Sequence, residues 1–130
     1  MSYHFKREPE SGLIIVSIEI DAKYELKMVF DTGATHTTID SNALYLLGYE
    51  LKDKVGTVEI ETANGIIETE VFEVGSFTSL GLTKENFQIQ VYDFLAHGIF
   101  SDYNGLLGLD FLEGTKFCVD TEENTITITS

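Results

Sequence analysis

Several residue types are scarce or missing in this chain of 130 residues. Trp is absent, Pro occurs once, and 8 basic residues stand against 22 acidic ones, which gives a formal charge of −14. The single Pro excludes a Pro-rich linker. Nucleic acid and anionic membrane surfaces repel a chain of this charge, because binding to them needs clustered Lys and Arg. We therefore expect neither as a partner, and the acidic surface is typical of a protein selected for solubility.

Cysteine and long apolar runs are also scarce. The single Cys118 excludes an internal disulfide, and its place in the apolar run 116–119 predicts a buried structural thiol. The longest apolar stretch, residues 13–20, contains Ser17 and Glu19 and is far shorter than the roughly 20 residues of a membrane helix. No secretory leader is recognisable. These absences predict a cytoplasmic location, and the start at Met1 without an obvious pro-segment gives no indication of regulation by precursor processing.

Alternation of apolar and polar residues with a period of two dominates the chain. Residues 13–20 and 24–30 both show it, on either side of a plausible turn at Asp21 and Ala22. This period is typical of half-buried strands. We expect further strands at residues 35–39, 55–61, 66–74, 86–94, 115–119 and 125–129. The length fits a single domain over residues 1–130, with residues 1–11 either flexible or in contact with a second subunit.

One segment, between Asp40 and Gly48, is predicted to form a helix. Asp40 is a favourable N-cap, and Gly48 occupies the position where many helices end in a left-handed residue. The apolar stripe between them comprises Ala43, Leu44, Leu46 and Leu47. Many short strands with one or two short helices predict a mainly β fold.

The residues best suited to chemistry follow the apolar strand 24–30. Asp31 ends that strand, and Thr32, Gly33 and Ala34 come next. Gly33 permits a tight turn whose free N–H can donate to a carboxylate, and the Thr32 hydroxyl can lock the loop. Taken alone, the triplet is more typical of an ordinary turn in which the Asp side chain accepts from the backbone.

Three segments in the same order resemble the retropepsin-like family of aspartic peptidases. The first is Asp31-Thr32-Gly33-Ala34, followed by a β-branched run and a helix. The second is the hairpin signal Ala63-Asn64-Gly65, which falls where the family carries its flap, although an ordinary surface hairpin is the alternative. The third is Leu106-Leu107-Gly108 before a short helix, similar to the family's second signature, which supports the Asp loop. The resemblance covers nearly the whole chain and implies an acid-protease barrel lobe.

The resemblance also implies a function, that of an aspartic endopeptidase. Two carboxylates share one proton in this chemistry and activate a water molecule. Only one Asp-Thr-Gly is present and the chain is too short for two lobes, so the second carboxylate is expected from another copy. The expected assembly is a C2 homodimer with one active site at the interface, where Asp31 is catalytic and Thr32 bonds across the axis.

The expected partners are a second copy of the chain and an extended peptide or protein substrate. This chemistry implies no cofactor, and no spacing of His, Cys or Asp suits a metal. His36, in the expected strand 35–39, is interpreted as a plain strand residue, with a role near the substrate as the alternative. Two other classes of function remain open. One is a catalytically silent retropepsin-like module that dimerises or binds peptide, and the other is an unrelated β-barrel binding domain.

The chain departs from the viral members of the family in two places. It has Leu109 and Asp110 after the Gly of the second signature, where viral members usually carry an Arg that helps to hold the dimer together. Viral enzymes also interleave both chain ends in the dimer sheet. Here residues 3–5 and 125–129 either do the same, or residues 125–129 only close a hairpin with residues 115–119.

Overall fold

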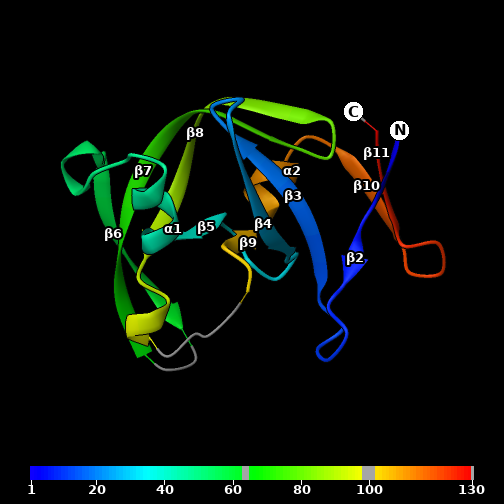
Figure 1. Ribbon diagram of the computed structural model, residues 1–130, viewed down its shortest axis with the longest axis horizontal. Helices are drawn as coiled ribbons and strands as arrows, with labels where there is room; N and C mark the ends of the chain where they lie inside the picture. The colour runs from blue at the N-terminus through cyan, green and yellow to red at the C-terminus, as the bar shows by residue number, and fades with distance from the viewer. Residues whose placement is uncertain (63–64, 98–101, 130) are drawn as a thin grey trace.

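The structure is a computed structural model that describes residues 1–62, 65–97 and 102–129. It is mainly β, as predicted, with a few short helices at the periphery (Figure 1). The elements in chain order are β1 (Ser2–His4), β2 (Lys6–Arg7), β3 (Ile14–Ile20), β4 (Tyr24–Phe30), β5 (Thr38–Asp40), α1 (Ser41–Leu46), η1 (Leu51–Asp53), β6 (Gly56–Thr62), β7 (Gly65–Ser79), β8 (Leu82–Tyr92), η2 (Leu95–His97), β9 (Gly105–Leu107), α2 (Leu109–Leu112), β10 (Lys116–Asp120) and β11 (Thr125–Thr129). No helix in these ranges is long and apolar enough to cross a membrane.

The strands form two sheets. The larger one has the order β2-β3-β4-β9-β5-β8-β7-β6, and β3 also pairs with β7. This additional pairing joins the sheet back onto itself, so that the strands from β3 to β7 enclose a barrel. The smaller sheet, β1-β11-β10, contains both chain ends and stands beside the barrel (Figure 1).

The hairpin of β3 and β4 confirms the predicted strands 13–20 and 24–30. In β3, buried residues alternate with the exposed Ser17 and Glu19. The turn residues Asp21 and Ala22 both have positive φ, 55° and 54°. Consecutive residues with positive φ match the right-handed twist of the strands that they join. The hairpin delivers β4, with Phe30 buried at its end, to the middle of the larger sheet.

The predicted helix is confirmed, with one error in its apolar stripe. The Asp40 side chain caps α1 by accepting from the N–H of Asn42, and Gly48 follows the helix with a φ of 99°. Leu44 is fully buried, but Leu46 is 87% exposed, so its inclusion in the stripe was wrong. The strand before the helix begins at Thr38 rather than at residue 35, because the loop after β4 occupies the residues up to 37.

Two strands are longer than predicted. β7 continues past residue 74 to Ser79, and β8 begins at Leu82 rather than at residue 86. They are joined by Leu80 and Gly81, with φ values of 52° and 77°. Past Gly75, β7 pairs with both β8 and the distant β3, and the Asp21 carboxylate accepts from the N–H of Gly75 at 3.0 Å.

Aromatic side chains fill the barrel. Phe72, Phe77 and Phe111 are fully buried, and the rings of Phe77 and Phe111 lie 5.3 Å apart. Burying a side chain of this size contributes about 1.5–3 kcal/mol. The same cluster includes Phe5 near one chain end and Ile128 near the other. The core therefore joins the terminal sheet to the barrel, and Phe111 holds α2 against it.

The terminal sheet is formed within one chain. β1 pairs with β11, with Tyr3 opposite Ile126, and β10 and β11 close the hairpin expected of residues 115–119 and 125–129. Cys118 is exposed, so the prediction of a buried thiol was wrong. β10 is the last strand of this sheet, and alternation turns Phe117, not Cys118, toward the core.

Candidate active site

Asp31 lies directly after β4 and is half-buried. Its N–H donates to the carbonyl of Leu107 at 3.0 Å, and its own carbonyl accepts from the N–H of Ala34 at 3.1 Å. The N–H of Gly33 donates to Oδ1 of Asp31 at 2.9 Å, as the sequence predicted. The loop thus holds the carboxylate through one oxygen, and no hydrogen bond to Oδ2 is formed among the residues that the structure describes.

A side chain at Gly33 would press on the Asp31 carboxylate. A Cβ on Gly33 would lie 3.2 Å from Oδ1 of Asp31, closer than most real Cβ contacts. The neighbouring Thr32 is exposed, and its hydroxyl makes no hydrogen bond within the described part of the chain. Because both Thr32 and Gly33 face solvent, this side of the loop is free to meet another molecule.

The loop is fastened by Thr37, which the sequence interpretation did not single out. Thr37 is fully buried, and its hydroxyl donates to the Asp110 carboxylate at 2.7 Å. The N–H of Thr37 also donates to both oxygens of Asp110, each at 3.0 Å. In turn the Thr37 hydroxyl accepts from the buried N–H of Gly108 at 3.1 Å. A carboxylate 73 positions along the chain therefore fixes the end of the loop that carries Asp31.

The second signature lies between the two strands that flank this loop. β9 pairs in parallel with β4, which puts Leu106 opposite Val29 and Leu107 opposite Phe30. On its other side β9 pairs antiparallel with β5. The chain leaves β4 at Asp31, crosses over β9 and returns in β5, so Leu107 lies beneath the loop.

Gly108 permits this crossing. A Cβ on Gly108 would lie 2.7 Å from the carbonyl carbon of His36 and 2.9 Å from the oxygen of Ala34, both backbone atoms. The N–H of the next residue, Leu109, donates to that same Ala34 oxygen at 2.8 Å. The close approach explains a Gly at this position better than any need for flexibility does.

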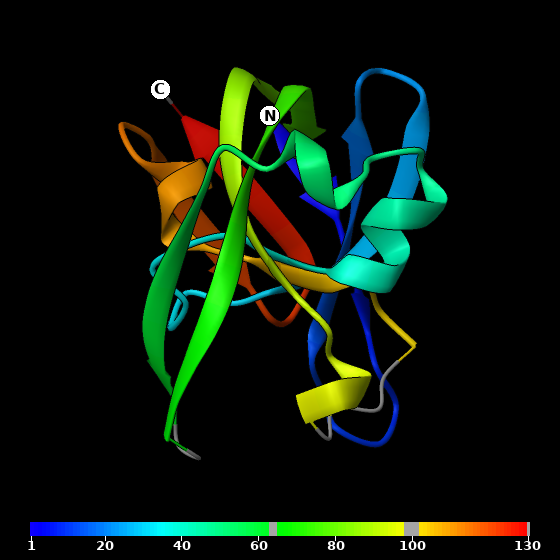
Figure 2. The ribbon, with the colours of Figure 1, turned by 90° about the vertical axis from the view of Figure 1, so that its left-hand side faces the viewer.

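The expected flap is the hairpin of β6 and β7. The pairing runs from Gly56 opposite Val71 to Thr62 opposite Gly65. The pairing of β7 with β8 begins only at Glu70, so residues 65–69 and their β6 partners extend as an arm from the barrel (Figure 2). Gly65 is exposed with a φ of 117°. The other predicted tip residues, Ala63 and Asn64, lie outside the described residues.

His36 lies in the loop and not in a strand. It is exposed, and its Nδ1 is 3.0 Å from the hydroxyl of Thr35. Neither residue contacts the Asp31 carboxylate through a hydrogen bond. In the described ranges no three His, Cys, Asp or Glu side chains are grouped as metal ligands would be.

The missed pair, Thr37 and Asp110, left only an ambiguous signal in the sequence. An Asp in the first turn of a helix is favoured at many helix starts because it faces the N-terminal N–H groups. Asp110 does accept from the N–H of Phe111 at 2.8 Å. Its bonds to Thr37 depend on the fold and are invisible in local spacing.

Together, the barrel, the crossed β9 and the loop around Asp31 define a retropepsin-like, single-lobe fold. A family model described as aspartyl protease matches residues 16–111. The chain belongs to this family. Among solved structures, it is similar to a retropepsin-like aspartic protease from Rickettsia conorii, with a TM-score of 0.73 and 22% identity over 98% of this chain and 89% of that chain. No curated protein matches the chain significantly.

Proposed function

We propose that the chain is an aspartic endopeptidase, a hydrolase that cuts peptide bonds with a water molecule activated by the Asp31 carboxylates of two copies. The observation that carries the proposal is the half-buried Asp31, held by the N–H of Gly33 with one oxygen to spare. Membership of the aspartyl protease family supports the same chemistry.

Two Asp31 carboxylates a few ångströms apart would share one proton, because two negative charges at that separation repel strongly. The ionised copy accepts a proton from the water, whose oxygen forms a bond to the carbonyl carbon of the substrate. The protonated copy donates its proton to the carbonyl oxygen. The carbon–nitrogen bond then breaks as a proton passes to the leaving amine. The bond from Gly33 keeps each carboxylate oriented for this exchange.

The second copy is required because the chain supplies only one Asp-Thr-Gly triplet. The exposed Thr32 and Gly33 are the parts of the loop that would approach the axis. β10 runs beneath this loop, since the ring of Phe117 contacts that of Phe30, the residue before Asp31, at 5.9 Å. A shallow hollow of about 420 Å³ lies between the loop, α2 with the turn that follows it, and β10. The loop and β10 therefore offer one continuous surface to a partner.

The outer edge of β10 is suited to pairing with itself. Among the described residues no strand pairs with this edge, and Val119 on it is exposed. Antiparallel pairing of two copies about Cys118 would place Lys116 opposite Asp120 and Phe117 opposite Val119. A two-fold interface needs a surface that complements itself, and this register provides both charge and apolar pairs. The arrangement differs from interleaved termini, because β1 already pairs with β11 of its own chain.

The arm of β6 and β7 is the proposed flap, with Ala63, Asn64 and Gly65 at its tip. An extended peptide would lie between this arm and the Asp31 loop, bound by main-chain hydrogen bonds. Leu106, Leu107 and Gly108 support the loop from below. The exposed Cys118 thiol is in keeping with the cytoplasmic location that we propose, since a reducing compartment keeps such thiols free.

The test is cleavage of a peptide library by purified wild type and by Asp31→Asn. The substitution preserves the size of the side chain and removes the base together with the shared proton. We expect the wild type to cut and the variant to be inactive but folded. Binding of peptides without cleavage by the wild type would instead identify a silent peptide-binding module.

A further inference from the structure

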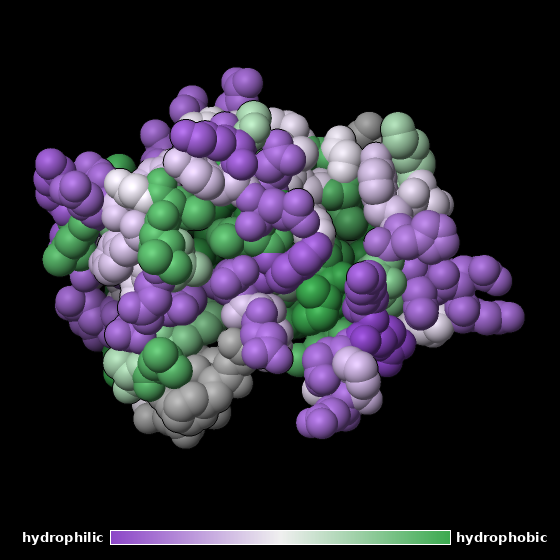
Figure 3. Space-filling model, in the orientation of Figure 1, coloured by the Kyte–Doolittle hydropathy of each residue, from purple (hydrophilic) through white to green (hydrophobic). Residues whose placement is uncertain are grey.

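One pocket lies beside β2, β3 and β4, away from the Asp31 loop itself. Its volume is about 460 Å³, and Ile15 and Val16 contribute apolar surface to it. Lys6 and Arg7 of β2 lie along one side, and Asp102 lies at the other. In the space-filling view, apolar surface is recessed between hydrophilic side chains in this region (Figure 3).

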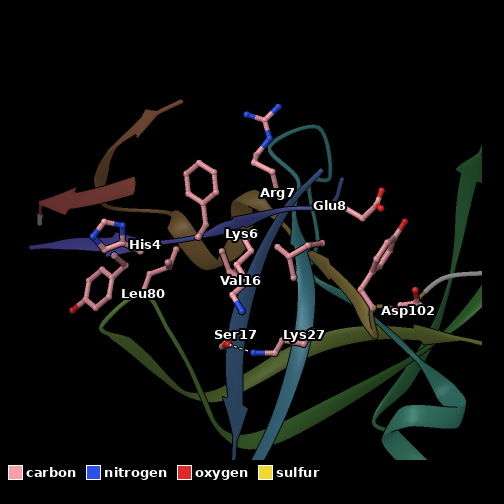
Figure 4. Close-up of a pocket in the computed structure, with 13 residues that line it drawn as sticks. His4, Lys6, Arg7, Glu8, Val16, Ser17, Lys27, Leu80 and Asp102 are labelled. Carbon is pink, nitrogen blue, oxygen red and sulfur yellow. Dashed lines mark hydrogen bonds between the residues drawn. The ribbon is translucent and has the colours of Figure 1, made fainter. Parts of the chain in front are cut away.

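Basic side chains are concentrated at this pocket, although the protein as a whole is strongly acidic. Lys6, Arg7 and Lys27, three of the 8 basic residues, line it. In Figure 4 the side chains of Lys6 and Lys27 point toward one another from opposite strands, whereas Glu8 and Asp102 lie at one end. Two ammonium groups that converge repel each other unless an anion lies between them.

The two lysines differ in their existing partners. The ammonium of Lys27 donates to Ser17 at 2.7 Å and to the exposed Glu25 at 3.1 Å. The side chain of Lys6 has no hydrogen bond or ion pair within the described ranges, although its backbone pairs with Ile15. The carboxylate of Glu8 does not form an ion pair with the Lys6 ammonium. It accepts instead from the N–H groups of Glu10 and Ser11 in its own turn.

The pocket lies on the same face of β4 as Asp31. Side chains alternate along a strand, so Lys27 shares its face with Val29, and continued alternation includes Asp31. Four residues of strand separate Lys27 from Asp31 by about 13 Å. Between them lies Val29, flanked by its cross-strand partners Ile15 and Leu106. These three residues form an apolar surface between the pocket and Asp31.

We propose that this pocket binds an acidic side chain, Asp or Glu, of the peptide substrate. The inference rests on the proposed peptidase function and names the class of substrate. A span of about 13 Å corresponds to about four residues of an extended peptide at roughly 3.3 Å each. Long Lys and Glu side chains can reach along the strand, so separations of about two or three residues are also within range. The preferred substrate has an apolar residue beside the cleaved bond and an acidic residue two to four positions away. In a symmetric dimer the same preference applies on both sides of the cut.

The test measures binding apart from cleavage. The probes are fluorescent decapeptides with Leu-Phe at the centre. Each carries one Glu, Gln or Lys, placed two, three or four residues from the central Leu-Phe bond. Their affinity for the uncut Asp31→Asn protein is measured by anisotropy, with and without Lys6→Glu. Lys6 has an exposed side chain, so its replacement leaves the fold intact. Lys52→Glu, at an exposed lysine paired with Glu50 and remote from the pocket, is the matched control for net charge.

The Glu peptide is expected to bind roughly tenfold more tightly than the Gln peptide, since each exposed ion pair contributes up to about fivefold. The preference should weaken at about 1 M salt, where the Debye length is about 3 Å. Lys6→Glu should favour the Lys peptide, while Lys52→Glu keeps the preference for Glu. Equal binding of the Glu and Gln peptides, binding of none, or an unchanged preference in Lys6→Glu overturns the proposal.

Cleavage of the same peptides by the wild type distinguishes a failure of the proposed acidic preference from a failure of the proposed peptidase function. If the Gln and Glu peptides are cut equally well, the acidic preference is wrong and the peptidase function stands. If the Glu peptide is bound selectively but never cut, the pocket is correct and the peptidase function is wrong.

Discussion

Replacing Thr37 by Val should loosen the loop that carries Asp31. Val has nearly the shape of Thr, but it lacks the hydroxyl that donates to Asp110 at 2.7 Å and accepts from the N–H of Gly108 at 3.1 Å. Thr37 is fully buried, so water does not readily replace these bonds. The change therefore removes hydrogen bonds while preserving the volume of the side chain.

The magnitude follows from the two bonds. A hydrogen bond to a charged group contributes about 1.5–3 kcal/mol, and a buried donor left without a partner costs about 1–3 kcal/mol. The backbone N–H groups of Thr37 and Phe111 still donate to Asp110, which limits the loss. We expect the free energy of unfolding to fall by about 3 kcal/mol in total. That is a large fraction of the stability of a domain, about 5–15 kcal/mol.

Urea unfolding of wild type, Thr37→Val and Thr37→Ser, at one protein concentration, measures this effect. Ser retains the hydroxyl and loses one methyl group, so Thr37→Ser should cost only about 1 kcal/mol. Peptidase activity should fall with Thr37→Val, because the loop end opposite Asp31 is released. If Thr37→Val unfolds within 0.5 kcal/mol of the wild type, or no worse than Thr37→Ser, the assigned role of Thr37 is refuted.

Three further predictions follow from the backbone and the proposed interface. Gly108→Ala should destabilise the fold by about 2 kcal/mol or more by overpacking, since its Cβ would lie 2.7 Å from a backbone atom. Gly56→Ala, where nothing lies within 4 Å of the added Cβ, is the control. Equal melting temperatures of these two variants would contradict the close approach at Gly108. Gly65→Val should reduce turnover and leave the circular dichroism spectrum unchanged, because a β-branched residue resists a φ of 117°; undiminished turnover would argue against a flap role. Lys116→Glu should raise the dissociation constant of the dimer roughly tenfold, measured by sedimentation, because it creates two like-charge pairs per interface. Adding Asp120→Lys should restore the wild-type value. If neither change alters the dissociation constant, the interface lies elsewhere.

The parts of the fold that local patterns govern could be predicted from the sequence. The hairpin of β3 and β4 depends on a period of two, and helix α1 depends on Asp40 and Gly48 next to it in the chain. The bond from Gly33 to Asp31 is equally local, two residues apart. In each case the interacting groups lie within a few positions of one another, so the residue order alone contains the signal.

The parts that depend on distant partners could not be predicted. Past Gly75, β7 pairs with β3, more than 50 positions earlier, and Asp21 accepts the N–H of Gly75. Thr37 meets Asp110 because β9, which leads into the helix that carries Asp110, lies between β4 and β5. Cys118 was expected inside because its neighbours are apolar, but the order of strands in the terminal sheet leaves β10 at an edge.

Mixing wild type with Asp31→Asn tests the central claim most directly, namely that one active site needs Asp31 from two chains. The two proteins are combined at constant total concentration and left until subunits have exchanged, and activity is measured against the wild-type fraction. If both carboxylates of a dimer are required, activity follows the square of that fraction, so an equal mixture retains about a quarter of the wild-type activity. An equal mixture that retains half of the activity would contradict the account, because each chain would then contain a complete site of its own.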